Sequence, residues 1–253
     1  MNGPSSPDAG ASTQDRLLGG RVLLEQPKQG YRVAIDPILL AAAIEAGPGE
    51  RILDAGCGTG AAALCLAARV LDCTLVGIEL DGELAGLART NVAANGMDGR
   101  IAIVERALQD YDGAFDQVMT NPPFYENDRH TSSPQATKAT AHGESTLDLA
   151  GWIKAAARLL KPGGRLTLIH RADRIGDILQ ACEGRLGAAA IFPLWPKADV
   201  EAKRILVSAI KGRRTPPRLL PGLVLHRADG GYTAQTQAIL RAAAPLDLER
   251  RSA

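Results

Sequence analysis

The residues best suited to chemistry form the tetrapeptide Asn121-Pro122-Pro123-Phe124, which directly follows the apolar run Phe115–Thr120. Neither proline has a backbone N–H and each fixes φ, so the chain must turn here, at the end of a strand that we expect to be buried. The turn brings an amide side chain, free carbonyl groups and an aromatic ring to one point. These groups can hold a planar amino group, because the oxygens accept its hydrogens and the ring covers its face.

The glycine-rich segment Asp54-Ala55-Gly56-Cys57-Gly58-Thr59-Gly60 follows a short apolar run and forms a second candidate site. Glycines between a first strand and the next helix let the backbone approach a ligand closely at the carboxyl edge of a sheet. The spacing lacks the last glycine of the dinucleotide fingerprint G-x-G-x-x-G. The carboxylate of Asp54 would also repel a diphosphate, so the segment suits a cationic or zwitterionic ligand. Cys57 is a small residue in this turn, and we interpret it as a packing residue.

Glu79 ends the apolar run 74–79 and stands nineteen residues after Gly60. We expect both positions at the carboxyl edge of one sheet, because each follows a predicted strand directly. An acid at this place can accept hydrogen bonds from both hydroxyl groups of a ribose. The two segments together therefore indicate a ligand that contains a nucleoside.

The elements that must position these residues follow from the alternation of apolar runs and helical patterns. Strands are predicted at 51–54, 74–79, 100–105, 115–120, 165–170, 188–194 and 204–211, and helices at 36–46, 60–70, 82–95, 147–160, 173–186 and around 233–243. We expect Asp36 to cap the first of these helices. We expect Lys161-Pro162-Gly163-Gly164 to end the helix at 147–160. The pattern predicts an α/β fold with a mostly parallel sheet and helices on both faces.

The composition is that of an ordinary globular chain: 253 residues, 45% hydrophobic and 23% charged. We expect one domain at 17–253, with a covering segment at 17–48 and a basic extension at 212–253, after a disordered tail at 1–16. The polar stretch 125–145 is predicted to be a substrate-contacting loop. Four cysteines without C-x-x-C spacing favour reduced thiols and argue against a metal site, and no apolar run is long enough to predict a membrane span.

The charge of the chain is uneven. From Glu201 onward, ten lysines and arginines stand against four acids, whereas the whole chain has a net charge of +1. A basic segment of this kind can contact the phosphates of a nucleic acid. An arginine-rich surface exposed to solvent explains the same composition, and the sequence leaves both interpretations open.

These motifs resemble those of the class I S-adenosylmethionine-dependent methyltransferases, over about residues 17–211. The segment 54–60 is similar to their motif I, Glu79 to their ribose-binding acid, and the tetrapeptide at 121–124 to the (D/N/S)-P-P-(Y/F/W) motif of members that methylate nitrogen. The resemblance implies a Rossmann-like, mostly parallel seven-stranded sheet. It also implies that S-adenosyl-L-methionine contacts Asp54, Gly56, Cys57, Gly58, Gly60, Glu79, Leu80, Arg106 and Asn121.

A narrower resemblance is to a bacterial tRNA adenine-N6 methyltransferase family, which modifies adenine 37 beside the anticodon of a valine tRNA. It is carried by Gly30-Tyr31-Arg32 with Asp36 and 39–41, and by Ala202-Lys203-Arg204 with Leu206-Val207. It implies that the protein is a cytoplasmic monomer that binds tRNA. The catalytic residues would be Asn121, Pro122, Pro123 and Phe124, and the substrate-binding residues Tyr31, Arg32, Phe124, Lys203 and Arg204.

Other functions remain open at this point. The same tetrapeptide serves guanine-N2 methylation of ribosomal RNA, amino methylation of DNA bases and methylation of the glutamine amide of a protein. A glycine-rich turn by itself also permits an NAD-dependent oxidoreductase, although the incomplete fingerprint and the Asn-Pro-Pro-Phe turn disfavour it. A non-catalytic RNA-binding protein with a relic cofactor pocket is the third class, and both intact motifs argue against it.

Overall fold

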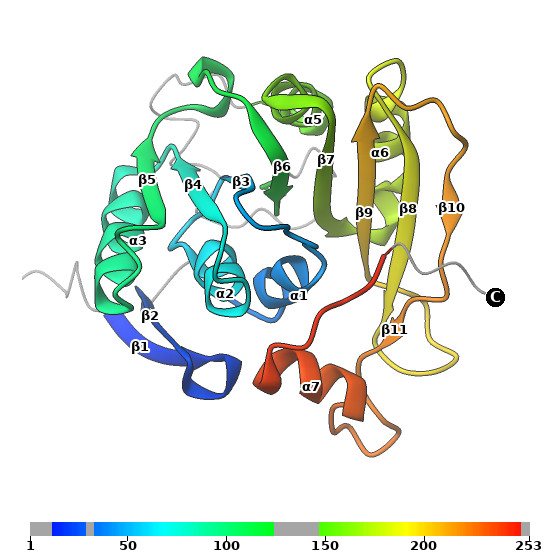
Figure 1. Ribbon diagram of the computed structural model, residues 1–253. Helices are drawn as coiled ribbons and strands as arrows, with labels where there is room; N and C mark the ends of the chain where they lie inside the picture. Colours follow the sequence, from blue (N-terminus) through cyan, green and yellow to red (C-terminus); the bar gives the residue numbers. More distant parts are fainter. Residues whose placement is uncertain (1–11, 29–32, 124–146, 249–253) are drawn as a thin grey trace, which may run out of the picture.

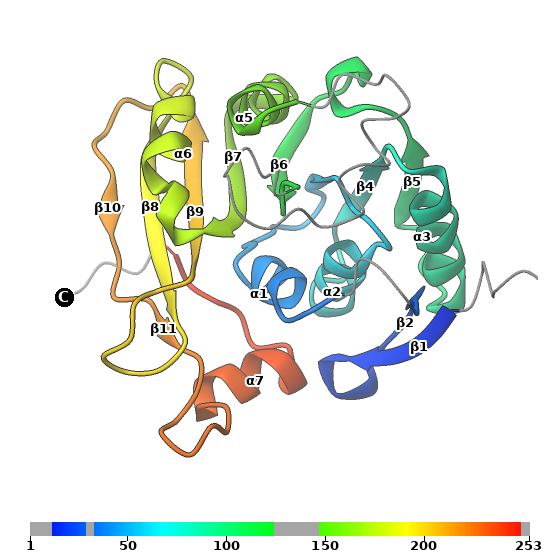
Figure 2. The same ribbon diagram turned by 180° about the vertical axis from the view of Figure 1, so that it is seen from behind.

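The structure of the protein is a computed structural model that describes residues 12–28, 33–123 and 147–248. It confirms the predicted α/β fold, in which helices cover both faces of a mostly parallel sheet (Figures 1 and 2). Within these residues no helix is long and apolar enough to cross a membrane. The same residues contain no group of three His, Cys, Asp or Glu side chains that could hold a metal ion.

The central sheet contains the seven predicted strands and two short additional ones. The seven are β3 (Arg51–Ala55), β4 (Thr74–Glu79), β5 (Ile101–Glu105), β6 (Phe115–Thr120), β7 (Leu160–Arg171), β8 (Leu186–Trp195) and β9 (Arg204–Lys211). They lie in the order β8-β9-β7-β6-β3-β4-β5, and only β9 runs antiparallel to its neighbours. β10 (Arg218–Leu219) and β11 (Leu223–Val224) pair with the outer edge of β8, so the described sheet has nine strands instead of seven.

The helices form two layers, each with its own hydrophobic core. They are α1 (Asp36–Ala42), α2 (Ala61–Arg69), α3 (Gly82–Ala94), α5 (Leu149–Arg158), α6 (Ile175–Cys182) and α7 (Ala234–Ala242). Successive residues of β3 point to opposite faces, so Ile52 joins the core beneath α1, α2 and α7, whereas Leu53 joins the core beneath α5 and α6. Burial on both faces is the reason that the strands are almost continuously apolar.

The order of the strands reverses between β3 and β6. The chain proceeds from β3 outward through β4 to β5, then returns to β6 on the other side of β3. Ligands of open α/β sheets bind at such a switch point, outside the carboxyl ends of the strands. Here Ala55 is in register with both Thr120 and Ile78. The glycine-rich segment, the Asn-Pro-Pro turn and Glu79 therefore leave three adjacent strands at one place.

An N-terminal hairpin precedes this sheet and corrects the predicted tail. β1 (Ser12–Leu17) and β2 (Val22–Pro27) pair antiparallel, so residues 12–16 form a strand. Asn95, which directly follows α3, accepts from the N–H of Leu23 at 2.9 Å and donates to its carbonyl at 2.8 Å. Asn91, one turn earlier, does the same with Glu25 at 2.6 and 2.8 Å. Two amide side chains thus replace a neighbouring strand and fix the hairpin to α3.

Four further predictions need correction in detail. Helix α1 ends at Ala42, and Asp36 is not its cap, because the carboxylate binds Nε of Arg204 at 3.1 Å and makes no capping hydrogen bond. The Lys161–Gly164 segment, predicted to stop the preceding helix, lies inside β7, where the pairing with β6 shifts register, and α5 already ends at Arg158. Helix α6 covers only 175–182 of the predicted 173–186, because a short 3₁₀ turn precedes it and β8 already begins at Leu186.

Candidate functional site

The glycine-rich segment makes a tight turn between β3 and α2. Gly56, Gly58 and Gly60 have φ of 72°, 54° and 84°, in the left-handed region. The N–H groups of Gly56 and Cys57 both donate to the carbonyl of Ile78 at 2.9 Å, which ties the turn to the end of β4. The turn therefore has one fixed conformation, which glycine adopts readily at all three positions.

Trp152 of α5 packs directly on this turn, although sequence reasoning did not single it out. A Cβ added to Gly56 would lie 2.9 Å from Cζ2 of the Trp152 ring. The indole N–H donates to Oγ1 of Thr120 at 2.9 Å, and that hydroxyl donates to the carbonyl of Ala55 at 2.7 Å. Trp152 thus joins the glycine turn to the residue directly before Asn121, and it holds the two motifs together.

Substitution of Gly56 by alanine is expected to destabilise the protein by about 3 kcal/mol. A left-handed alanine costs roughly 1–2 kcal/mol, and contact with Trp152 adds about 1–3 kcal/mol of overpacking. The melting temperature should fall by roughly 10 °C in a protein of this size. Gly86→Ala in α3 is the matched control, because nothing lies within 4 Å of the added Cβ and alanine favours a helix. Equal melting temperatures of the two variants would refute the close approach of Trp152.

Glu79 lies between the glycine turn and the start of α3. One carboxylate oxygen accepts from the N–H of Gly58 at 2.8 Å, and the other accepts from those of Leu80 and Asp81 at 2.8 and 3.0 Å. Burial raises the pKa of Glu79, while the three N–H groups oppose that shift. The oxygen that binds Gly58 keeps a further lone pair, whereas the other oxygen uses both of its lone pairs on Leu80 and Asp81. The carboxylate is thus fixed in place with acceptor capacity for a hydroxyl group of a ligand.

Leu80 and Arg106, for which the resemblance implies contact with the cofactor, lie beside Glu79. Leu80 is one of the few large apolar side chains that is exposed, at 42% of its surface. The backbone N–H of Arg106 donates to the carbonyl of Glu79 at 2.9 Å, and its side chain is exposed. Both residues therefore border the same corner of the sheet edge, and their contact with a cofactor remains a prediction.

Asp54 lies beneath the glycine turn, where its carboxylate accepts from the N–H of Ala63 at 3.1 Å. Burial raises the pKa of Asp54 to about 7, the hydrogen bond from Ala63 opposes this shift, and the charge of Glu79 adds to it. Cys57 is also buried, and burial raises the pKa of its thiol well above the ordinary value. A protonated thiol packed beside Gly77 fits the prediction of a packing residue and not of a nucleophile.

Asn121 follows β6 directly, and its side-chain oxygen is buried. Among the described residues this oxygen has no hydrogen-bond partner. A buried acceptor without a partner costs on the order of 1–3 kcal/mol. Pro122 is buried and Pro123 is exposed. The turn thus holds a preformed acceptor beside the glycine segment, which is what a bound amino group would require.

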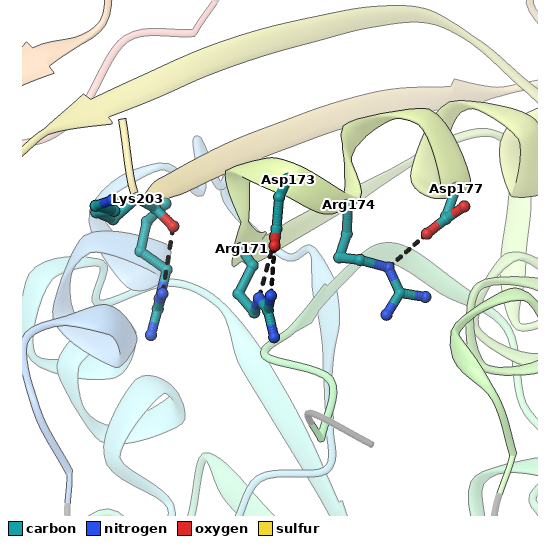
Figure 3. A network of polar contacts seen from close by, with 6 residues as sticks. Arg171, Asp173, Arg174, Asp177 and Lys203 are labelled. Atoms are coloured by element: carbon teal, nitrogen blue, oxygen red, sulfur yellow. Dashed lines mark hydrogen bonds and ion pairs between the residues drawn. The ribbon is translucent and has the colours of Figure 1, made fainter. Parts of the chain in front are cut away.

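Basic side chains gather at the same edge of the sheet, where β7 ends and β9 begins (Figure 3). Lys203 is exposed, whereas Arg204 binds Asp36 and thereby fixes the start of α1 to β9. Arg171 binds Asp173 and Arg174 binds Asp177, two pairs that the sequence did not reveal. Of the five predicted substrate-binding residues, Lys203 and Arg204 lie at this edge; Lys203 is exposed, Arg204 has a structural contact, and their binding of a substrate remains a prediction.

Three predicted site residues lie outside the described residues: Tyr31, Arg32 and Phe124. The predicted substrate loop at 125–145 lies outside them as well. Their roles remain predictions.

Comparison with known proteins assigns the family. The family model of the methyltransferase small domain matches residues 34–177, more than half of the chain. The tRNA1(Val) (adenine(37)-N6)-methyltransferase of Porphyromonas gingivalis is 34% identical, over 84% of this chain and 88% of the relative. The protein of the same name from Aeromonas salmonicida is 32% identical, over 83% of this chain and 89% of the relative.

Solved structures agree on the fold. A predicted O-methyltransferase from Agrobacterium tumefaciens superposes with a TM-score of 0.70 at 26% identity, covering 84% of this chain and 98% of the other. Geranyl diphosphate C-methyltransferase from Streptomyces coelicolor gives 0.50 at 16% identity, covering 68% and 73%, which supports the fold alone. From the family model and the two relatives, the chain belongs to the methyltransferase small domain family and, within it, to the tRNA1(Val) (adenine(37)-N6)-methyltransferases.

Proposed function

We propose that this protein transfers a methyl group from S-adenosyl-L-methionine to the N6 amino group of adenine 37 in a valine tRNA. The observation that carries the proposal is the buried side-chain oxygen of Asn121, an acceptor without a partner among the described residues, beside a glycine turn that can hold a nucleoside. The substrate named for the two curated relatives supports the choice of tRNA and of position 37.

The site has the donor and acceptor groups that the cofactor requires. Glu79 would hold the ribose, because its carboxylate is fixed and the oxygen that binds Gly58 keeps acceptor capacity for a hydroxyl group. The glycine turn would lie against the amino-acid part, and Leu80 would cover the adenine ring. When bound, S-adenosylmethionine supplies a methyl group on a positively charged sulfur, already activated for attack by a nucleophile.

The chain's own contribution is to orient the target nitrogen. The lone pair of an adenine amino group is delocalised into the ring, so the nitrogen is a poor nucleophile. The side-chain oxygen of Asn121 and the carbonyl of Pro122 would each accept one N–H and thereby localise that lone pair. Positioned acceptors of this kind lower the barrier by orientation and electrostatics, and no strong base is needed. Phe124 would stack on the base, as aromatic side chains do with extruded bases.

The same two acceptors favour nitrogen over oxygen as the methylated atom. A primary amino group has two hydrogens and satisfies both acceptors, whereas a hydroxyl group has one. The solved structure from Agrobacterium tumefaciens is titled a predicted O-methyltransferase. For this chain we therefore propose methylation of an amino group in spite of that title.

Asp54 predicts a pH dependence of cofactor binding. Because the pKa of Asp54 is raised to about 7, the carboxyl is partly neutral near that pH, and a cationic ligand binds better to the ionised form. Affinity for S-adenosylmethionine should rise with pH by up to about tenfold per unit below pH 7 and level off above it. Titration calorimetry from pH 5.5 to 8.5 measures this slope. Asp54→Asn should remove it, and an equally steep slope in that variant would assign the titration elsewhere.

The proposed substrate is tested with labelled S-adenosylmethionine and four separate acceptors: tRNA, ribosomal RNA, DNA and a glutamine-containing protein fraction. The tRNA should come from a strain that lacks this protein, and the products are identified by nucleoside mass analysis. We expect N6-methyladenosine in tRNA alone. Methyl transfer to another acceptor would keep the cofactor and refute the tRNA substrate, and NADH binding in place of S-adenosylhomocysteine would refute both.

A further inference from the structure

We infer a second substrate-binding site, a basic groove that binds backbone phosphates of the RNA at the edge of the sheet opposite the candidate active site. The groove has a volume of about 280 Å³ and is lined by Arg165, Ala188, Ile210, Arg213, Thr215, Pro216 and Arg218. Three of these seven residues are arginines and none is an acid. The inference rests on the proposed function, because it names where the same tRNA is held.

The groove is built by an irregularity in β8. The pairing of β8 with β9 shifts between Gly187 and Ala190, and Ala188 there has φ of 53°. The chain that leaves β9 crosses directly over this bulge, since a Cβ on Gly187 would lie 2.3 Å from the carbonyl oxygen of Arg213. The N–H of Ala188 donates to the carbonyl of Thr215 at 2.8 Å. Bulges re-aim side chains at sheet edges, and this one holds the segment 213–215 directly against the strand.

Two of the three arginines of the groove carry charges that are exposed to solvent. Arg213 and Arg218 are exposed, and within the described part of the chain neither forms an ion pair with an acid. Arg165 donates to Oγ of Ser208 at 3.3 Å, which holds the third guanidinium at the inner wall. Guanidinium groups present forked donors that match phosphate oxygens. A ligand with several anionic oxygens fits these walls, and an apolar or cationic ligand does not.

The position of the groove indicates an extended RNA instead of a free anion. Arg165 and Arg171 lie six residues apart in β7, which is about 20 Å at the rise of a strand. Arg171 lies at the carboxyl edge, with Lys203 (Figure 3). A molecule with its target base at the carboxyl edge reaches the groove only if its backbone continues for about that length. The stem of a folded RNA does so.

The test compares Arg213→Ala/Arg218→Ala with Arg16→Ala/Arg21→Ala. The control removes the same charge from exposed residues of the β1–β2 hairpin, which lies at the opposite side of the molecule from β10 (Figures 1 and 2). Binding of full-length tRNA is measured over a range of salt concentrations. For the groove variant we expect roughly tenfold weaker binding, which is the loss that two exposed ion pairs predict. The slope of log affinity against log salt concentration should be smaller in magnitude by about 2. The kcat and the affinity for S-adenosylhomocysteine should be unchanged.

The outcomes separate this inference from the proposed function. Wild-type protein that leaves tRNA unmethylated would overturn both. Normal methylation with equal affinity and salt slope for the groove and control variants would overturn the groove alone. Inorganic phosphate that raises the melting temperature of wild type but not of the groove variant, with tRNA binding unaffected, would assign the groove to a free anion and overturn the RNA contact.

Discussion

Substitution of Asn121 by alanine is expected to lower kcat for methyl transfer by about 10²–10³-fold, the usual effect of removing one preorganised group that stabilises a transition state. The side-chain oxygen of Asn121 is buried and has no partner in the described part of the chain. We therefore assign it to one N–H of the target amino group. The KM for tRNA should change much less than kcat, because the interaction strengthens as charge develops on the nitrogen.

The control for this prediction is Asn121→Asp, which keeps a side-chain oxygen at the same place. Its kcat should lie between those of alanine and wild type, since the acceptor remains and the amide N–H₂ is lost. S-adenosylhomocysteine should still bind to all three proteins within a few-fold, as calorimetry can measure. An alanine variant with the kcat of wild type would remove Asn121 from the mechanism.

The second large effect is expected for Glu79→Ala, which should weaken cofactor binding about a hundredfold. The carboxylate accepts from the N–H groups of Gly58, Leu80 and Asp81, so its loss leaves these donors without their acceptor and removes the ribose contact. A loss of about 3 kcal/mol corresponds to this factor. Titration calorimetry with S-adenosylhomocysteine measures it directly.

Two variants sharpen this test. Glu83→Ala removes an exposed acid from the next turn of the chain and should bind the cofactor like wild type. Glu79→Asp keeps the charge but shortens the side chain by one methylene, so it should lose the reach to Gly58 and bind at an intermediate level. If Glu79→Ala and Glu83→Ala bind equally well, Glu79 does not contact the ribose.

The sequence predicted the central sheet and both motifs because their signals are local. Glycines directly after the β3 strand and an acid at the end of β4 can be recognised without knowing any distant contact, and so can the two prolines after β6. The family resemblance adds the mostly parallel seven-stranded sheet, whereas the strand order comes from the structure. These three strand ends meet because Ala55 is in register with Thr120 and Ile78.

The features that the sequence did not reveal depend on contacts between distant segments. The sequence does not predict the hairpin, because β1 is polar. The hairpin is held through β2 by Asn91 and Asn95, about 70 residues away. In a helical pattern Trp152 is indistinguishable from an ordinary core residue, and only packing against Gly56 gives it a role. The local pattern around Asp36 predicts a helix cap. Its actual partner, Arg204, cannot be recognised from that pattern, because it lies 168 residues further along the chain.

The central claim is methylation of the amino group of one adenine, and the most direct test uses two valine tRNA transcripts. One carries adenine at position 37 and the other carries guanine there. With labelled S-adenosylmethionine and purified protein, we expect one methyl group per molecule in the first transcript, recovered as N6-methyladenosine, and none in the second. Equal labelling of the two transcripts, or recovery of the label in any other nucleoside, would contradict the account.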